Sequence, residues 1–198
     1  MKRLLAYAVC AAIVVAVPVL GYAADKASDK SGLPSGERKF LMNVAHDNKA
    51  EIELGRLASE RGSSDAVKQF GQRMVTDHQK ATDELMQLAQ QKGITLPTDV
   101  DAKHKKAHDK LAKLSGADFD RAYMREMARE HDKDVKAFER EAKSGRDADV
   151  KAFAQKMLPT LNEHKQQAHQ VASTVNANRA HTRKGGSSQP SASPSSTK

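Results

Sequence analysis

The sequence predicts an all-α protein, a ferritin-like four-helix bundle made of two helical hairpins joined by a long connection. Three observations support this fold class. Apolar residues recur every three or four positions, as in amphipathic helices, over residues 37–61, 65–92, 118–143 and 147–175. No convincing strand alternation occurs between these segments. The middle connection, residues 93–117, is long enough to run the full length of a bundle, although an up-down-up-down arrangement is the alternative.

Turn residues separate the four segments at the expected places. Gly62 followed by Ser64 suits the end of the first helix and the N-cap of the second. Gly145 and Asp147 repeat this arrangement between the third and fourth helices, and Gly93 closes the second. We therefore expect one bundle domain over residues 37–175.

The N-terminus has the pattern of a secretory signal peptide. Residues 1–23 begin with Lys2 and Arg3, continue with an apolar run and end in small residues around Ala23. We expect export to the periplasm or outer membrane, with residues 24–36 as a flexible segment; an uncleaved anchor is the alternative. The only cysteine, Cys10, lies in the signal, so the mature chain would have no thiolate chemistry.

The positive charge of the chain is concentrated at its two ends. The formal charge of +8 includes a C-terminal segment, residues 176–198, that is basic and rich in Ser, Pro and Gly. We expect this segment to be a disordered tail that could contact an anionic envelope polymer or lipid. The rest of the mature chain has 27 Lys and Arg against 25 Asp and Glu, and this near-neutral balance argues against a nucleic-acid partner.

Each predicted helix places one metal-ligand type of side chain on its apolar face, near its middle: Glu51, His78, His131 and His164. A buried imidazole needs a hydrogen bond or a metal. Three imidazoles and a carboxylate suit a transition metal ion such as Zn²⁺, Fe²⁺, Mn²⁺ or Cu²⁺. The alternative is a metal-free hydrogen-bond network among the same four residues.

Neighbouring residues could support such a site. Asp77, Glu130 and Glu163 each precede a histidine by one position and could orient a histidine on the next helix, although solvated surface is their commoner role. His104 and His108, one helical turn apart, could form a surface metal pair or belong to a solvated basic loop. Three methionines could add thioether ligands for copper or simply fill the core: Met74, Met127 and Met157.

The chain resembles an exported bacterial family catalogued as domain of unknown function 4142, whose members have a ferritin-like four-helix bundle. The resemblance rests on four stretches: "EIELGRLASE" (51–60), "FGQRMVTDH" (70–78), "FDRAYMREMAREH" (119–131) and "FAQKMLPTLNEH" (153–164). It implies the fold over about residues 37–174, the envelope location and the importance of the four core residues, but no established activity. The Glu-x-x-His motif of di-iron bundles is absent, so we expect a single-metal or metal-free bundle and favour no enzymatic activity.

Two functional hypotheses follow. The first is an exported bundle protein that binds a transition metal through Glu51 and the three histidines and serves metal handling or envelope stress defence. The second is a non-catalytic envelope interaction protein whose core histidines form a metal-free hydrogen-bond network.

Overall fold

The computed structural model describes residues 32–185, and over that range its regular elements are all helices. The expected signal peptide and the segment from residue 186 to the C-terminus lie outside the described residues. The helices are α1 (Ser35–Arg61), α2 (Asp65–Lys92), α3 (Ala102–Leu111), α4 (Gly116–Ser144) and α5 (Ala148–Gly185). The predicted all-α bundle is confirmed, and the last helix continues about ten residues beyond its expected end, without interruption at Pro159.

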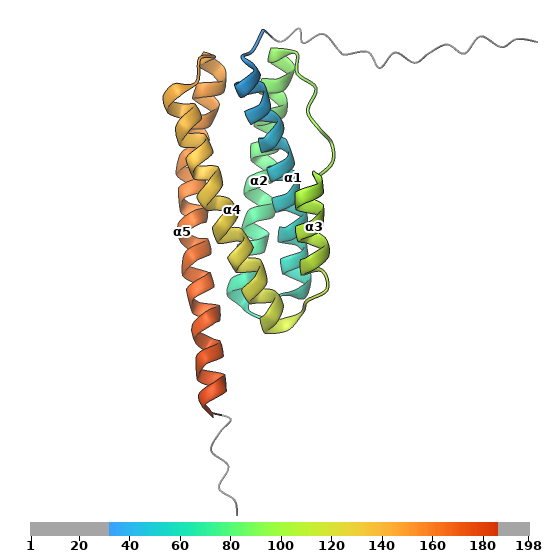
Figure 1. The fold of residues 1–198 in the computed structure, drawn as a ribbon, viewed down its shortest axis with the longest axis vertical. Coiled ribbons are helices and arrows are strands. Elements are labelled where there is room, and N and C mark those ends of the chain that lie inside the picture. Colours follow the sequence, from blue (N-terminus) through green and yellow to red (C-terminus); the bar gives the residue numbers. More distant parts are fainter. Residues whose placement is uncertain (1–31, 186–198) are drawn as a thin grey trace, which may run out of the picture.

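The two hairpins are joined by a crossover connection, as in ferritin-like folds. In Figure 1, α1 and α2 form one antiparallel pair, and α4 and α5 form the other. The connection leaves the upper end of α2 and returns to the lower end of the bundle, where α4 begins, so α2 and α4 run in the same direction. The up-down-up-down alternative is therefore wrong. The connection also contains a short helix, α3, which packs on α1.

Carboxylates from the opposite hairpin hold both hairpin turns. Asp120 of α4 accepts hydrogen bonds from the backbone N–H groups of Ser63 and Ser64, both at 2.9 Å, and from the Ser63 hydroxyl at 2.6 Å. The Ser64 side chain itself makes no capping bond to α2. At the other end, Glu37 of α1 accepts hydrogen bonds from backbone N–H groups in the α4–α5 turn. The turn of each hairpin is thus attached to a helix of the other hairpin, one at each end of the bundle.

Two glycines bring α1 and α2 into backbone contact. A Cβ atom on Gly55 would lie 2.5 Å from the Gly71 carbonyl oxygen, and one on Gly71 would lie 2.7 Å from the Gly55 carbonyl oxygen. A larger residue at either position would force the helices apart. This close approach sets the distance between the helices that carry Glu51 and His78.

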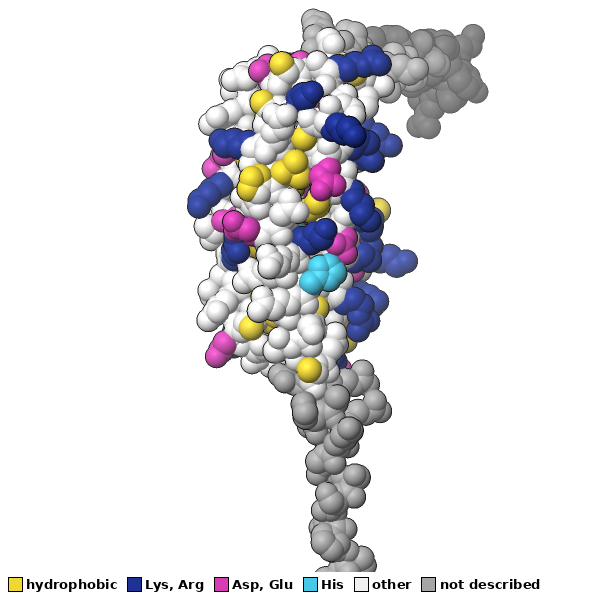
Figure 2. Space-filling model, turned by 90° about the vertical axis from the view of Figure 1, so that its left-hand side faces the viewer, with side chains coloured by type: hydrophobic (Ala, Val, Ile, Leu, Met, Phe, Trp, Pro, Cys, Tyr) yellow, Lys and Arg dark blue, Asp and Glu magenta, His cyan; other side chains and the backbone are white. Residues whose placement is uncertain are grey.

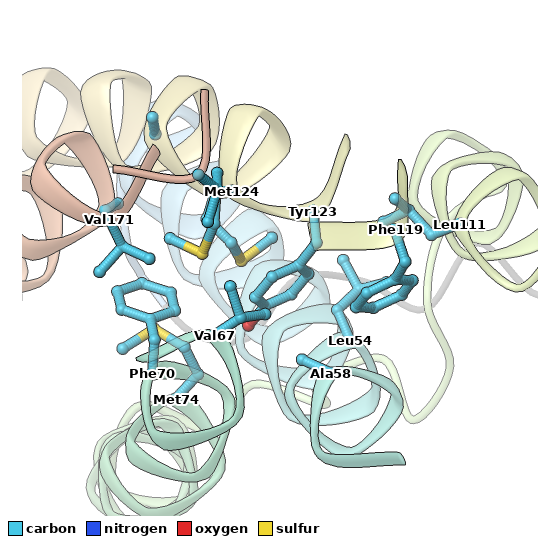
Figure 3. Packing of buried hydrophobic residues seen from close by; sticks show 14 of the residues in the cluster. Leu54, Ala58, Val67, Phe70, Met74, Leu111, Phe119, Tyr123, Met124 and Val171 are labelled. Atoms are coloured by element: carbon cyan, nitrogen blue, oxygen red, sulfur yellow. The ribbon is translucent and has the colours of Figure 1, made fainter. Parts of the chain in front are cut away.

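The core forms two apolar clusters, one at each end of the bundle. The lower cluster, near the α1–α2 turn, includes Phe70 and Met74 of α2 and the stacked rings of Phe119 and Tyr123, whose centroids are 5.6 Å apart (Figure 3). The upper cluster is built around these residues: Leu41, Leu85, Val135, Phe138, Val150 and Phe153. The three core histidines lie along their helices between the two clusters.

The surface carries charges of both signs. On the face shown in Figure 2, Lys and Arg side chains are interspersed with acidic ones and with small apolar patches. No described helix combines the length and apolar character that crossing a membrane requires.

Candidate metal centre

Three of the four predicted ligands meet in the middle of the bundle. His78 of α2, His131 of α4 and His164 of α5 are 4%, 0% and 1% exposed. Each offers one ring nitrogen, and these nitrogens all lie within 4.8 Å of one another. The ring centroids are 5.4 to 6.0 Å apart. Such spacing lets three imidazoles share one metal ion after small side-chain adjustments.

The second nitrogen of each ring is held by a hydrogen bond, which fixes the position of the ring proton. His78 Nδ1 donates to Asn48 Oδ1, His131 Nδ1 to the Met127 carbonyl oxygen and His164 Nε2 to Asp77 Oδ2, each at 2.9 Å. The other three nitrogens, His78 Nε2, His131 Nε2 and His164 Nδ1, are buried and have no hydrogen-bond partner within the described part of the chain. Their lone pairs therefore face the shared space between the rings, as metal-ligating histidines require.

All three histidines are held in the neutral form that binds metal. Burial lowers the pKa of each ring, and for His131 the value falls to about 4. Repulsion from neighbouring imidazolium charges lowers the pKa of His78 and His131 further. The site would therefore be ready to bind a cation at neutral pH without first losing protons.

One of the three acidic neighbours orients a histidine on another helix. Burial alone would raise the pKa of Asp77, but the hydrogen bonds from His164 and Arg73 bring it below its ordinary value. Arg73 also donates to Glu163, at 2.6 Å, so Glu163 supports the site only indirectly. Glu130 instead forms ion pairs with surface lysines.

Glu51 does not join the histidines in this structure. Among the described residues, the group of side chains within metal-ligand distance of one another contains the three histidines alone. Glu51 is 3% exposed, its Oε2 atom lacks a hydrogen-bond partner in the described chain, and burial raises its pKa well above the ordinary value. It lies close enough to the buried Tyr123 to raise the pKa of that phenol as well.

Helix α1 contributes Asn48 to the site. Asn48 lies one turn before Glu51 on the same buried face of α1, so its inward position follows from helical periodicity. Its role as the acceptor for His78 depends on the tertiary contact between α1 and α2, which periodicity does not give.

The second pair of histidines is used differently. His104 is 6% exposed and contacts Asp47 of α1 at 3.2 Å and Asp101 at 2.9 Å. It therefore attaches α3 to the bundle and does not pair with His108, which lies beside Asp109. The expectation of a solvated basic loop is wrong at His104, because the loop folds into a helix that buries this ring.

A cavity of about 380 Å³ adjoins the histidines and is lined by side chains from α1, α2, α4 and α5. His78 and His164 form part of its wall, together with Asn48 and Met157. The other two methionines considered as copper ligands, Met74 and Met127, are fully buried in the lower cluster.

The fold and the site together define a class of protein, a crossover four-helix bundle with three histidines at its centre. The model of the family described as Domain of unknown function (DUF4142) matches residues 23–171, and the chain belongs to this family, as the resemblance predicted. No curated protein matches the chain.

Two solved structures share the fold at low sequence identity. One is a DUF305 fragment from Deinococcus radiodurans, which is 13% identical, has a TM-score of 0.63 and covers 72% of this chain and 98% of its own. The other is a conserved hypothetical protein from Mycobacterium tuberculosis, which is 17% identical, has a TM-score of 0.54 and covers 81% of this chain and 98% of its own. At these identities the similarity describes the fold alone.

Proposed function

We propose that this protein binds one transition metal ion, Zn²⁺, Fe²⁺, Mn²⁺ or Cu²⁺, through His78, His131 and His164. The observation that carries the proposal is the convergence of three buried, unpartnered ring nitrogens on one space. Leaving three such acceptors without protons or a cation would cost free energy, which a bound ion would offset. Borderline ions accept neutral nitrogen donors of this kind.

The metal-free network is less well supported by the same contacts. A hydrogen-bond network among the rings would need a proton between each pair of nitrogens. The single proton of each neutral ring is already donated outward, to Asn48, Met127 or Asp77. With neutral rings in these tautomers, the histidines cannot donate hydrogen bonds to one another.

We also propose that the protein acts in the periplasm or at the outer membrane, in metal handling or envelope stress defence, without a catalytic reaction of its own. The support for export is the signal-peptide pattern of residues 1–23. The basic tail, residues 176–198, would then be the contact for an anionic envelope polymer or lipid.

Metal analysis of the untagged mature protein tests the metal proposal. Elemental mass spectrometry of the exported protein, followed by titration with each candidate ion, should give about one ion per chain. The variants His78→Ala, His131→Ala and His164→Ala should each lose it. His169→Ala is the matched control, because His169 lies on α5 but is exposed and pairs with Asp132. A protein that takes up none of the four ions, or that binds equally well without the three histidines, would refute the proposal.

The same titration decides the role of Glu51. The histidine group alone accounts for binding if Glu51→Gln changes the affinity by less than about threefold. A larger loss would show that Glu51 moves into the site when metal binds, as the sequence predicts.

A further inference from the structure

The two sides of the histidine group are packed very differently. On the side of the lower cluster, Phe70, Met74 and Met127 have no exposed surface, and the Phe70 ring lies 6.3 Å from the His131 ring. On the other side lies the cavity whose wall includes His78 and His164. A ligand that reaches the ion from outside the protein must therefore come through the cavity.

The size and walls of the cavity suit a small molecule. At about 30 Å³ per water molecule, a volume of about 380 Å³ holds roughly a dozen waters. Part of the wall is apolar and is formed by Phe138, Phe153, Met157 and Leu161. Such a space admits a ligand of a few atoms and is at the small end for drug-sized compounds.

Most charges in the cavity wall are already paired. Asp77 is bound to Arg73 and His164, and Glu84 pairs with Lys156 at 2.8 Å. Lys80 is exposed at the rim and forms no ion pair with any described residue.

Two further carboxyls, Asp47 and Asp134, line the cavity. Asp47 contacts His104, and burial raises its pKa. Burial and the repulsion of Asp47 raise the pKa of Asp134 well above its ordinary value, which favours the neutral form. Among the described cations in the cavity wall, Lys80 is the one without an ion pair, so it remains available to an incoming ligand.

A divalent ion held by three neutral imidazoles keeps its full charge of two in a buried site. Its own ligands supply no negative charge, and the carboxylate bound to His164, Asp77, is already shared with Arg73. A small anion entering from the cavity would complete the coordination and reduce this buried charge.

We propose that the cavity is a binding chamber for a small anion, which coordinates the metal ion at the position left open by His78, His131 and His164. The inference rests on the proposed metal site. It extends that proposal by assigning a ligand class and an access route, past Lys80 and Ala81 of α2.

The test uses the mature chain loaded with Co²⁺, whose visible absorption bands respond to a change of ligands. Azide is titrated as the anion probe into the wild type, Ala81→Leu and Ala172→Leu. Ala81 lines the cavity one turn after His78, so a leucine there occupies part of the chamber without replacing a ligand. Ala172→Leu makes the same change on α5 at a partly buried position against the lower cluster.

Azide should change the cobalt bands of the wild type and of Ala172→Leu with similar affinity. Ala81→Leu should still bind Co²⁺ but should bind azide about tenfold more weakly or not at all. Unchanged bands in a Co²⁺-loaded wild type, or equal azide affinity in Ala81→Leu, would overturn the chamber and leave the metal site standing. If Co²⁺ itself does not bind, while the other candidate ions also fail, the metal site and the chamber both fall.

Discussion

Replacing Asp77 by alanine removes the group that orients His164 without removing any proposed metal ligand. In the wild type, Asp77 accepts a 2.9 Å hydrogen bond from His164 Nε2, which leaves Nδ1 facing the other two histidines. Without the carboxylate, the ring can rotate or place its proton on Nδ1, and either change removes the lone pair from the site. Arg73 keeps Glu163 as a partner, so the surface ion pair survives.

The size of the effect follows from the bond that is lost. A hydrogen bond to a charged group contributes about 1.5–3 kcal/mol, and loss of such a partner of a ligating histidine lowers metal affinity by about 10–100-fold. We therefore expect Asp77→Ala to bind metal about 10–100-fold more weakly than the wild type. Asp77→Asn, which keeps an acceptor oxygen but not the charge, should fall between the two.

Chelator competition at neutral pH measures these affinities, and thermal unfolding of the apo-proteins checks that each variant folds. Glu163→Ala is the matched control, because it removes the other carboxylate bound to Arg73 at an exposed position. Its metal affinity should stay within about threefold of the wild type. If Asp77→Ala also stays within that range while His164→Ala loses the metal, Asp77 does not orient the ring and the reasoning fails.

Three further predictions concern stability. His131 has a pKa of about 4 in the folded protein, below its value near 6.5 in the unfolded chain. Between these pH values the unfolded chain binds more protons, so the apo-protein should lose stability as the pH falls through this range. Chemical unfolding of wild type and His131→Asn across that range should show the wild type losing up to about 3 kcal/mol relative to the variant; a constant difference would contradict the buried neutral ring. Gly55→Ala should lower the free energy of unfolding by about 1–3 kcal/mol, whereas Gly36→Ala should not, because a Cβ at Gly36 meets nothing within 4 Å. Equal unfolding midpoints for the two variants would show that α1 and α2 can separate at no cost. Asp120→Ala removes three hydrogen bonds at the α1–α2 turn and should lower the free energy of unfolding by about 2–4 kcal/mol. The exposed Asp118→Ala should lower it by less than about 0.5 kcal/mol, and similar denaturation curves for the two variants would show that Asp120 does not hold the turn.

Helical periodicity was sufficient to predict the architecture, because each long helix buries a continuous apolar face. The stripe is buried at Val67, Met74, His78 and Leu85, which is why an inward histidine could be recognised without a structure. The details of the turns were not predictable in this way. Local sequence points to Ser64 as the cap of α2, but its side chain makes no capping bond, and the turn is instead held by Asp120, which is distant along the chain.

The limits of periodicity are clearest on α1. Asn48 and Glu51 share one face and are similarly buried, so the pattern alone cannot say which of them reaches the histidines. The answer depends on the height of α1 relative to α2, which is set by the close contact of Gly55 and Gly71. A difference of three residues, about 4.5 Å along the helix axis, separates a residue that touches His78 from one that does not.

The distribution of the histidines over the two hairpins gives a metal ion a structural role as well. His78 belongs to the α1–α2 hairpin, whereas His131 and His164 belong to the α4–α5 hairpin. Next to the site the hairpins are separated by the cavity, so at this height side-chain packing between them is incomplete. An ion bound by all three rings would join the hairpins where the core is hollow, while Asp120 and Glu37 join them at the ends. Since metal that binds only the folded chain adds a free energy of RT ln(1 + [M]/Kd), even micromolar affinity would stabilise this bundle measurably at millimolar metal.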